Sequence, residues 1–207
     1  MRRIGQVEVF TAVLLTGVFI ASVSAVYFWG VPLIEKRQAS TEINIADNLI
    51  RDIEAAILEV AQTEGTSQKA INLNLKGKLE ASQEKNSITY VIDAKYPIYP
   101  SLGSLLNDFL PPDQVGVLGS NKPGVIVAKS ERIDSQTYRT TYTLAYRELI
   151  NPGTFEGIKI VINTPRNNIA TAGTHTLSIF KKGVNVEKGE SNLEGNLISN
   201  LIDVTIT

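Results

Sequence analysis

The stretch that decides the fold is residues 9–34, which read VFTAVLLTGVFIASVSAVYFWGVPLI. No charged residue interrupts it, and it exceeds the roughly 20 apolar residues that a helix needs to cross a bilayer core. The apolar region of a cleaved secretory signal is shorter, about 7 to 15 residues, so cleavage at the small residues around Ala25 is the weaker interpretation. The sequence predicts a transmembrane helix that stays on the mature chain.

The charges on either side of this helix predict its orientation. Arg2 and Arg3 lie in the short segment 1–8, and positive residues favour the cytoplasmic side. We therefore expect a cytoplasmic N-terminus and an extracytoplasmic segment 65–207. The aromatic residues 27–29 near the outer end are typical of an interfacial belt rather than of a binding site.

A second, amphipathic helix is predicted over residues 35–64. Its apolar residues recur at alternating steps of three and four, the spacing of a heptad stripe. Pro32 predicts a kink before it and Gly65 a stop after it. The stripe could pack on the chain's own β domain or on other copies of the chain, and the two are compatible. The stripe consists of Ile43, Ala46, Ile50, Ile53, Ile57 and Val60.

Beyond residue 65 the apolar period changes from helical to alternating. Residues 71–75, 87–93, 124–129, 138–146, 158–162 and 202–206 read as strands, with turns between them and no long helix. On the 138–146 run, Tyr138, Tyr142, Leu144 and Tyr146 share the face expected in the core. The proline-bearing segment 96–121 predicts a long loop with a helical turn over 104–110. The fold class expected is α+β, a long N-terminal helix followed by an antiparallel β-sandwich-like domain.

The composition points away from most chemistry. The 207 residues carry a net charge of −1 with no basic stripe, so a nucleic-acid partner is not expected. There is no cysteine, and the single histidine, His175, lies at a predicted strand start without metal-ligand spacing around it. No phosphate loop, nucleophile elbow or dinucleotide fingerprint occurs. We predict no enzymatic activity, no catalytic residue, no metal and no cofactor.

The head of the chain carries a short recognisable pattern. Arg2 and Arg3, then Gly5-Gln6, then an uncharged helix resemble the class III signal peptide of archaeal type IV pilins and archaellins. The resemblance implies that a prepilin peptidase cuts between Gly5 and Gln6 and leaves the apolar helix on the subunit. Two features depart from the family pattern: Ile4 stands between the arginines and Gly5, and the family's acidic residue at mature position five is not matched, because Glu8 would be third.

The resemblance implies a structural subunit of a type IV pilus-like filament. In that reading, segment 1–8 is the leader region, 9–34 anchors the precursor in membrane lipid and then builds the filament core, and 35–64 is a stalk. The β domain 65–207 would lie outside the cell as a candidate adhesive surface. Partners would be the peptidase, the assembly machinery and other copies of the chain in a helical homo-oligomer, with contacts through Glu8 and the heptad stripe. Glu8 could pair with a neighbour's new amino terminus or simply complement the helix dipole. The alternatives are a permanently anchored extracytoplasmic binding protein and a minor pilin.

Overall fold

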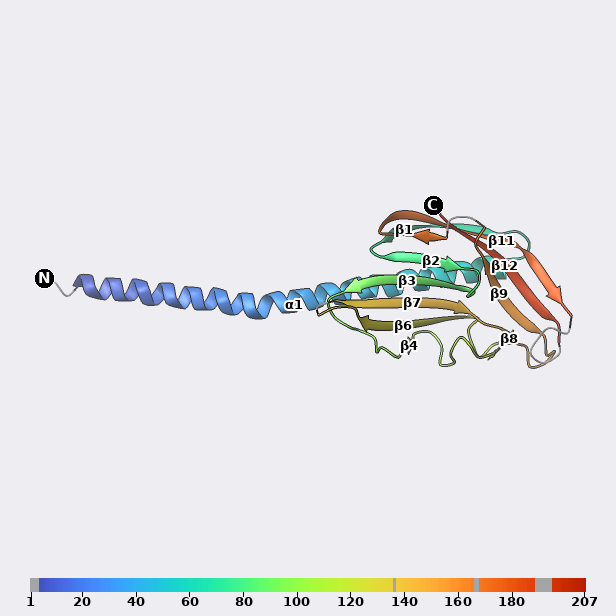
Figure 1. Cartoon of the computed structure of the whole chain (residues 1–207), viewed down its shortest axis with the longest axis horizontal. Coiled ribbons are helices and arrows are strands. Elements are labelled where there is room, and N and C mark those ends of the chain that lie inside the picture. Colours follow the sequence, from blue (N-terminus) through green and yellow to red (C-terminus); the bar gives the residue numbers. More distant parts are fainter. Residues whose placement is uncertain (1–3, 136, 166–167, 189–194) are drawn as a thin grey trace. The chain divides into compact units, whose positions relative to one another are not determined.

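The structure is a computed structural model that describes residues 4–135, 137–165, 168–188 and 195–207, with residues 4–8 described for their backbone alone. The chain divides into two compact units, Met1–Thr41 and Glu42–Thr207. The described residues form one helix, α1, and twelve strands, joined by turns and loops (Figure 1). The second unit therefore contains part of α1 together with every strand.

Helix α1 extends from Ile4 to Gln62. The predicted transmembrane and stalk helices thus join into one element, and Pro32 lies inside it without ending it. The helix ends two residues before the predicted boundary at residue 64. Gly65 then takes a positive φ of 75°, a conformation that glycine adopts at little cost.

The strands form two six-stranded sheets, and the first, sheet A, is mixed. Its order is β1-β11-β12-β9-β8-β5. β12 runs parallel to β9, and β5 runs parallel to β8, while the other neighbours are antiparallel. The prediction of an antiparallel domain is therefore wrong for sheet A. After β11 the chain reverses, and β12 runs between β11 and β9 in the same direction as β9. The strand bounds are β1 Gln68–Leu75, β11 Gly173–Glu187, β12 Leu197–Ile206, β9 Gly157–Asn163, β8 Leu149–Ile150 and β5 Gly116–Val117.

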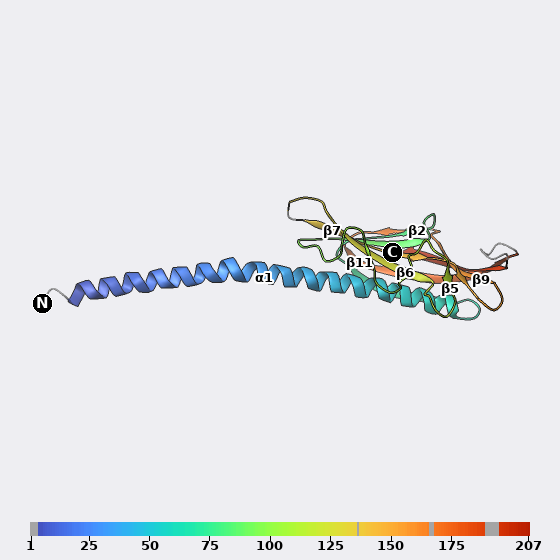
Figure 2. The ribbon, with the colours of Figure 1, turned by 90° about the horizontal axis from the view of Figure 1, so that it is seen from below.

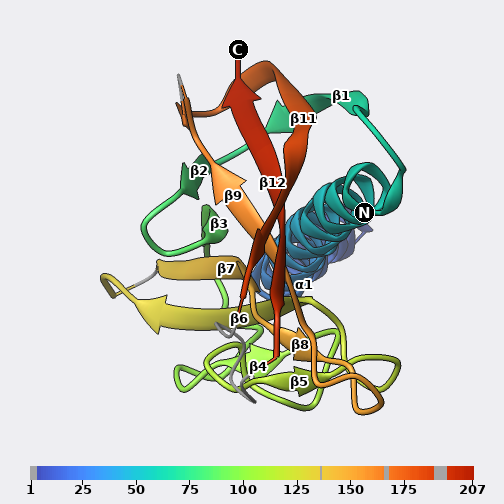
Figure 3. The same cartoon turned by 90° about the vertical axis from the view of Figure 1, so that its right-hand side faces the viewer.

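Sheet B is antiparallel throughout, in the order β10-β2-β3-β7-β6-β4. Its strands run obliquely to those of sheet A (Figures 1 and 3). The helical turn predicted over residues 104–110 is wrong, because Ser104–Leu105 pairs with β6 as strand β4, and Leu106 N donates to Ile126 O at 2.9 Å. The strand bounds are β10 Ile169–Ala170, β2 Lys78–Ser82, β3 Ser87–Ala94, β7 Tyr138–Tyr146, β6 Gly124–Arg132 and β4 Ser104–Leu105.

Both sheets and α1 contribute to one hydrophobic core. In Figure 2 the part of α1 after residue 42 lies along the strands of its unit. On β7 the predicted face is largely confirmed: Tyr142, Leu144 and Tyr146 are buried, and Tyr138 is half-buried. The Tyr142 hydroxyl also donates to the Ile43 carbonyl of α1 at 3.1 Å, which ties β7 to the helix.

The heptad stripe lies in this same core. None of its six side chains is more than 1% exposed, so packing on the chain's own β domain is confirmed for residues 43–60. The second interpretation is corrected at these positions, because fully covered side chains leave no surface for another copy unless the domain opens. The six residues are Ile43, Ala46, Ile50, Ile53, Ile57 and Val60.

Candidate assembly and binding surfaces

Among the described residues, the segment 9–34 of α1 carries a long run of exposed large apolar side chains. Its big side chains are exposed on every side of the helix, up to 85% for Trp29. By length and composition, this helix is long and apolar enough to cross a membrane. Such a surface is unfavourable in water, so it needs lipid or other apolar helices to cover it.

The predicted processing site lies at the edge of what the structure describes. Gly5, Gln6 and Glu8 belong to α1 by their backbone, and their side chains lie outside the described residues. Arg2 and Arg3 lie outside them altogether. Cleavage after Gly5 and the pairing of Glu8 therefore stay predictions.

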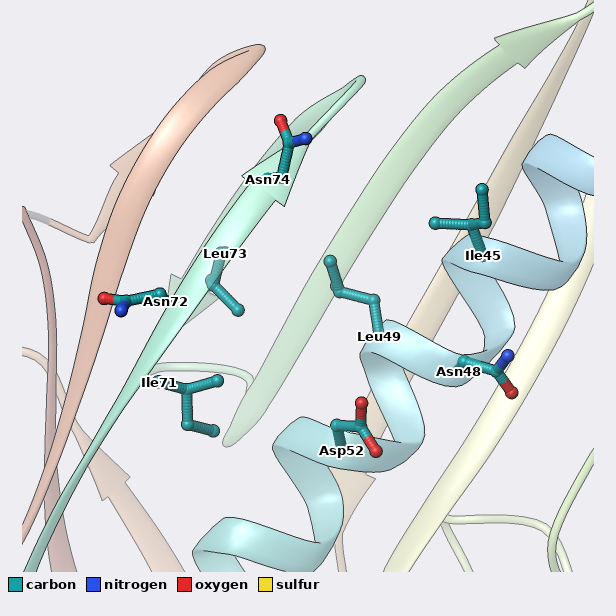
Figure 4. A pocket seen from close by; sticks show the side chains of 8 residues that line it. All are labelled: Ile45, Asn48, Leu49, Asp52, Ile71, Asn72, Leu73 and Asn74. Carbon is teal, nitrogen blue, oxygen red and sulfur yellow. The ribbon is translucent and has the colours of Figure 1, made fainter.

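A groove of about 290 Å³, here called the α1–β1 groove, runs between the helix and the edge strand of sheet A. Ile45, Asn48, Leu49 and Asp52 line it from α1, and residues 71–74 line it from β1 (Figure 4). β1 pairs only with β11 among the described strands, so its other edge is open. The groove offers an apolar wall with amides on its rim.

Ion pairs connect α1 to β1 and to the residue that follows β1, near the two ends of this groove. Lys76 Nζ donates to Glu42 Oε1 at 2.9 Å, and Lys69 pairs with Glu59. Asp52, between them, makes no hydrogen bond or ion pair with any residue that the structure describes. The groove thus contains one exposed carboxylate that has no partner among the described residues.

A second set of contacts holds residues 104–110, here called the strap, against α1. The Asn107 amide donates to Glu54 Oε1 at 2.7 Å and to Gly124 O at 3.0 Å. Arg51 Nη2 donates to Leu106 O at 3.2 Å. These bonds join Arg51 to Leu106 and Glu54 to Asn107, and they hold the strap on the helix although the partners are far apart in the sequence.

The strap is anchored by a buried ion pair between Asp108 and Arg147, whose side chains are 3% and 2% exposed. Burial alone would raise the pKa of Asp108, but hydrogen bonds from the backbone of Lys122, Leu110 and Phe109 outweigh it and lower this pKa to about 2. Arg147 also donates to three backbone carbonyls around the strap. Both buried charges are therefore fully partnered, as buried charges must be.

Glu54 is the buried carboxylate of α1. Burial raises its pKa, and Lys122, Asn107 and Arg51 oppose that shift only in part. Burial, with Glu54 nearby, also raises the pKa of Tyr146. These polar side chains hold the strap against α1 inside the folded unit.

Lys181 of β11 closes the C-terminal end of α1. Its amine is buried and donates to Ala61 O at 2.7 Å and to Thr63 O at 2.8 Å. A cation at this end complements the helix dipole and satisfies carbonyls that have no partner within the helix.

The Lys181 contact and the Asp108–Arg147 pair were not predicted from the sequence, because both join residues that are distant in the chain. The available signal for Lys181 was its place two residues after Ile179, on the face of β11 that buries Leu177 and Ile179.

His175 lies near the start of β11, as expected, and its Nε2 is 3.0 Å from Thr171 O. Among the residues that the structure describes, no three histidine or acidic side chains converge where they could hold a metal ion. Basic side chains do gather around a hollow beside Lys76, Lys78 and Arg139, but each has an acidic partner, Glu42, Glu80 or Asp93.

Comparison with known proteins gives no relative: no family model, curated protein or solved structure matches the chain.

Proposed function

We propose that this chain is a structural subunit of a type IV pilus-like filament on an archaeal cell surface. The observation that carries the proposal is the exposed apolar segment 9–34, which continues as the same helix into a domain core. The Arg2-Arg3 and Gly5-Gln6 pattern adds the resemblance to class III signal peptides.

The precursor sits in the membrane through segment 9–34, with its N-terminus in the cytoplasm and its β domain outside. A prepilin peptidase removes the first five residues, and assembly machinery extracts the subunit from the lipid. Burial of the apolar helices against one another then drives assembly. Identical subunits joined by a head-to-tail contact that does not close form a helical filament. The β domain forms the outer surface and is a candidate for adhesion.

The deciding experiment is the mass of the mature chain. Intact mass spectrometry of the protein from its membranes should show a chain that begins at Gln6. Gly5→Leu is the matched variant, and it should leave the precursor uncut because the peptidase requires a small residue there. Electron microscopy of material sheared from the cells should show filaments that contain the chain.

The alternative, a permanently anchored binding protein, predicts different results. A mass that begins at Met1, together with the absence of filaments, would overturn the proposed function in favour of that alternative. A chain that begins at Gln6 but occurs only at filament ends would mark a minor pilin.

A further inference from the structure

The α1–β1 groove presents an apolar wall beside an acidic group. Ile45, Leu49 and Asp52 are spaced by four and three residues along α1, so they lie on one face of the helix. Ile45 is 47% exposed, and Asp52 has no partner within the described chain. A ligand that fits this face has an apolar part followed by a cation.

The same chain carries a segment with the matching order. Gly30, Ile34 and Arg37 are also spaced by four and three along α1, and Ile34 is 57% exposed. Lys36 adds a second positive charge beside Arg37. The two faces correspond position by position at a constant offset of fifteen residues: 30 with 45, 34 with 49 and 37 with 52.

We infer that the α1–β1 groove receives the segment 30–37 of a second copy, with the two helices parallel and offset by fifteen residues. Ile34 then packs on Leu49, Gly30 leaves room for the Ile45 side chain, and Arg37 pairs with Asp52. The inference rests on the proposed function, since it names the parts of two copies that meet during assembly.

Charge and direction both favour this register. A parallel alignment at this offset brings all three matches together, whereas an antiparallel one that keeps Ile34 on Leu49 opposes Val31 to Asp52 and leaves the carboxylate unpaired. The ion pair is exposed, so it adds more to register than to affinity. Because the two faces differ, the contact is head-to-tail, and because each copy is shifted along the helix axis by fifteen residues, it repeats from copy to copy without closing into a ring.

The chain contains no cysteine, which makes disulfide cross-linking a clean test. A full-length Ile34→Cys/Leu49→Cys chain, expressed in cells that make the filament and treated with a mild oxidant, should give a ladder of dimers, trimers and longer species on non-reducing gels. A bridge inside one copy is excluded, because fifteen residues of helix span roughly 22 Å and a disulfide joins Cα atoms about 4.4 to 6.8 Å apart. The matched control is Ile34→Cys/Ala55→Cys, an exposed position on the same helix but out of register. We expect at least fivefold less cross-linking in the control.

Charge reversal keeps the inference testable if the cysteine pair impairs assembly. Arg37→Glu with Lys36→Glu should lower filament yield severalfold, Asp52→Lys should do the same, and the combined variant should recover most of the loss. Filaments with no cross-linking above the control, or with no recovery in the combined variant, would overturn this register and leave the proposed function standing. An unprocessed chain that makes no filaments would overturn both.

Discussion

The two apolar stretches of α1 differ in what covers them. Residues 43–60 carry a single apolar stripe, and it is buried under the two sheets of the β domain. Residues 9–34 are apolar on all sides and exposed along their whole length. A stripe on one side of a helix can be covered by a single partner. A helix that is apolar on all sides must be surrounded, for example by lipid or by several other helices. The width of the apolar surface thus separates the part of the helix that serves the fold from the part available to other molecules.

The largest expected effect comes from matched truncations in the two stretches. Ile53→Ala should lower the free energy of unfolding of the β domain by about 3 kcal/mol, because it leaves a cavity in a close-packed core. Ile20→Ala removes the same atoms from an exposed position and should leave that free energy within roughly 0.5 kcal/mol of wild type. Denaturant unfolding of both full-length variants in detergent, followed by near-ultraviolet circular dichroism, measures the difference. Equal losses in the two variants would refute the division of α1 into a fold half and an assembly half.

A second prediction concerns the strap that covers the buried stretch. The pKa of Asp108 is about 2 in the folded chain, below its ordinary value of 3.8, so the ionised carboxylate stabilises the fold. That contribution, about 2 kcal/mol, is fully present above pH 4 and is lost as the pH falls through about 2. The free energy of unfolding, measured from pH 6 to pH 2, should therefore fall more steeply for wild type than for Asp108→Asn. Parallel curves for the two chains would show that the pair does not hold the strap.

Sequence periodicity predicted most of the local structure. The spacing of apolar residues alone indicates which face of an element is buried. This holds for the uncharged run 9–34, the heptad stripe and the alternating strands. The core face of β7 followed the same logic, and Gly65 marked the end of α1 to within two residues.

What the sequence did not reveal depends on contacts between distant residues. The parallel pairing of β12 with β9 follows from the path of the chain, which strand patterns do not encode. In the strap, β4 forms because β6 offers hydrogen-bond partners, although Ser104 and Leu105 alone give no strand signal. Lys181 and Arg147 can be buried only because α1 and the strap supply carbonyls for them, and strand patterns do not show these partners. The stripe itself was compatible with two partners, and only the three-dimensional packing decides between them.

The smallest effect tests the one carboxylate buried on the covered stretch. Burial raises the pKa of Glu54 above its ordinary value of 4.5, so its ionisation opposes folding, and the stability it contributes falls as the pH rises through the folded pKa. Glu54→Gln keeps an oxygen for the Asn107 amide without the charge. At pH 7 this variant should therefore match or exceed wild type by up to about 1 kcal/mol, and the difference should vanish at pH 4. Glu54→Ala, which leaves the Asn107 amide without that acceptor, is the control and should be less stable at both pH values. If Glu54→Gln proves less stable than wild type at pH 7, the ionised carboxylate belongs to the fastening of the helix, and the covered stretch of α1 tolerates charge as well as apolar packing.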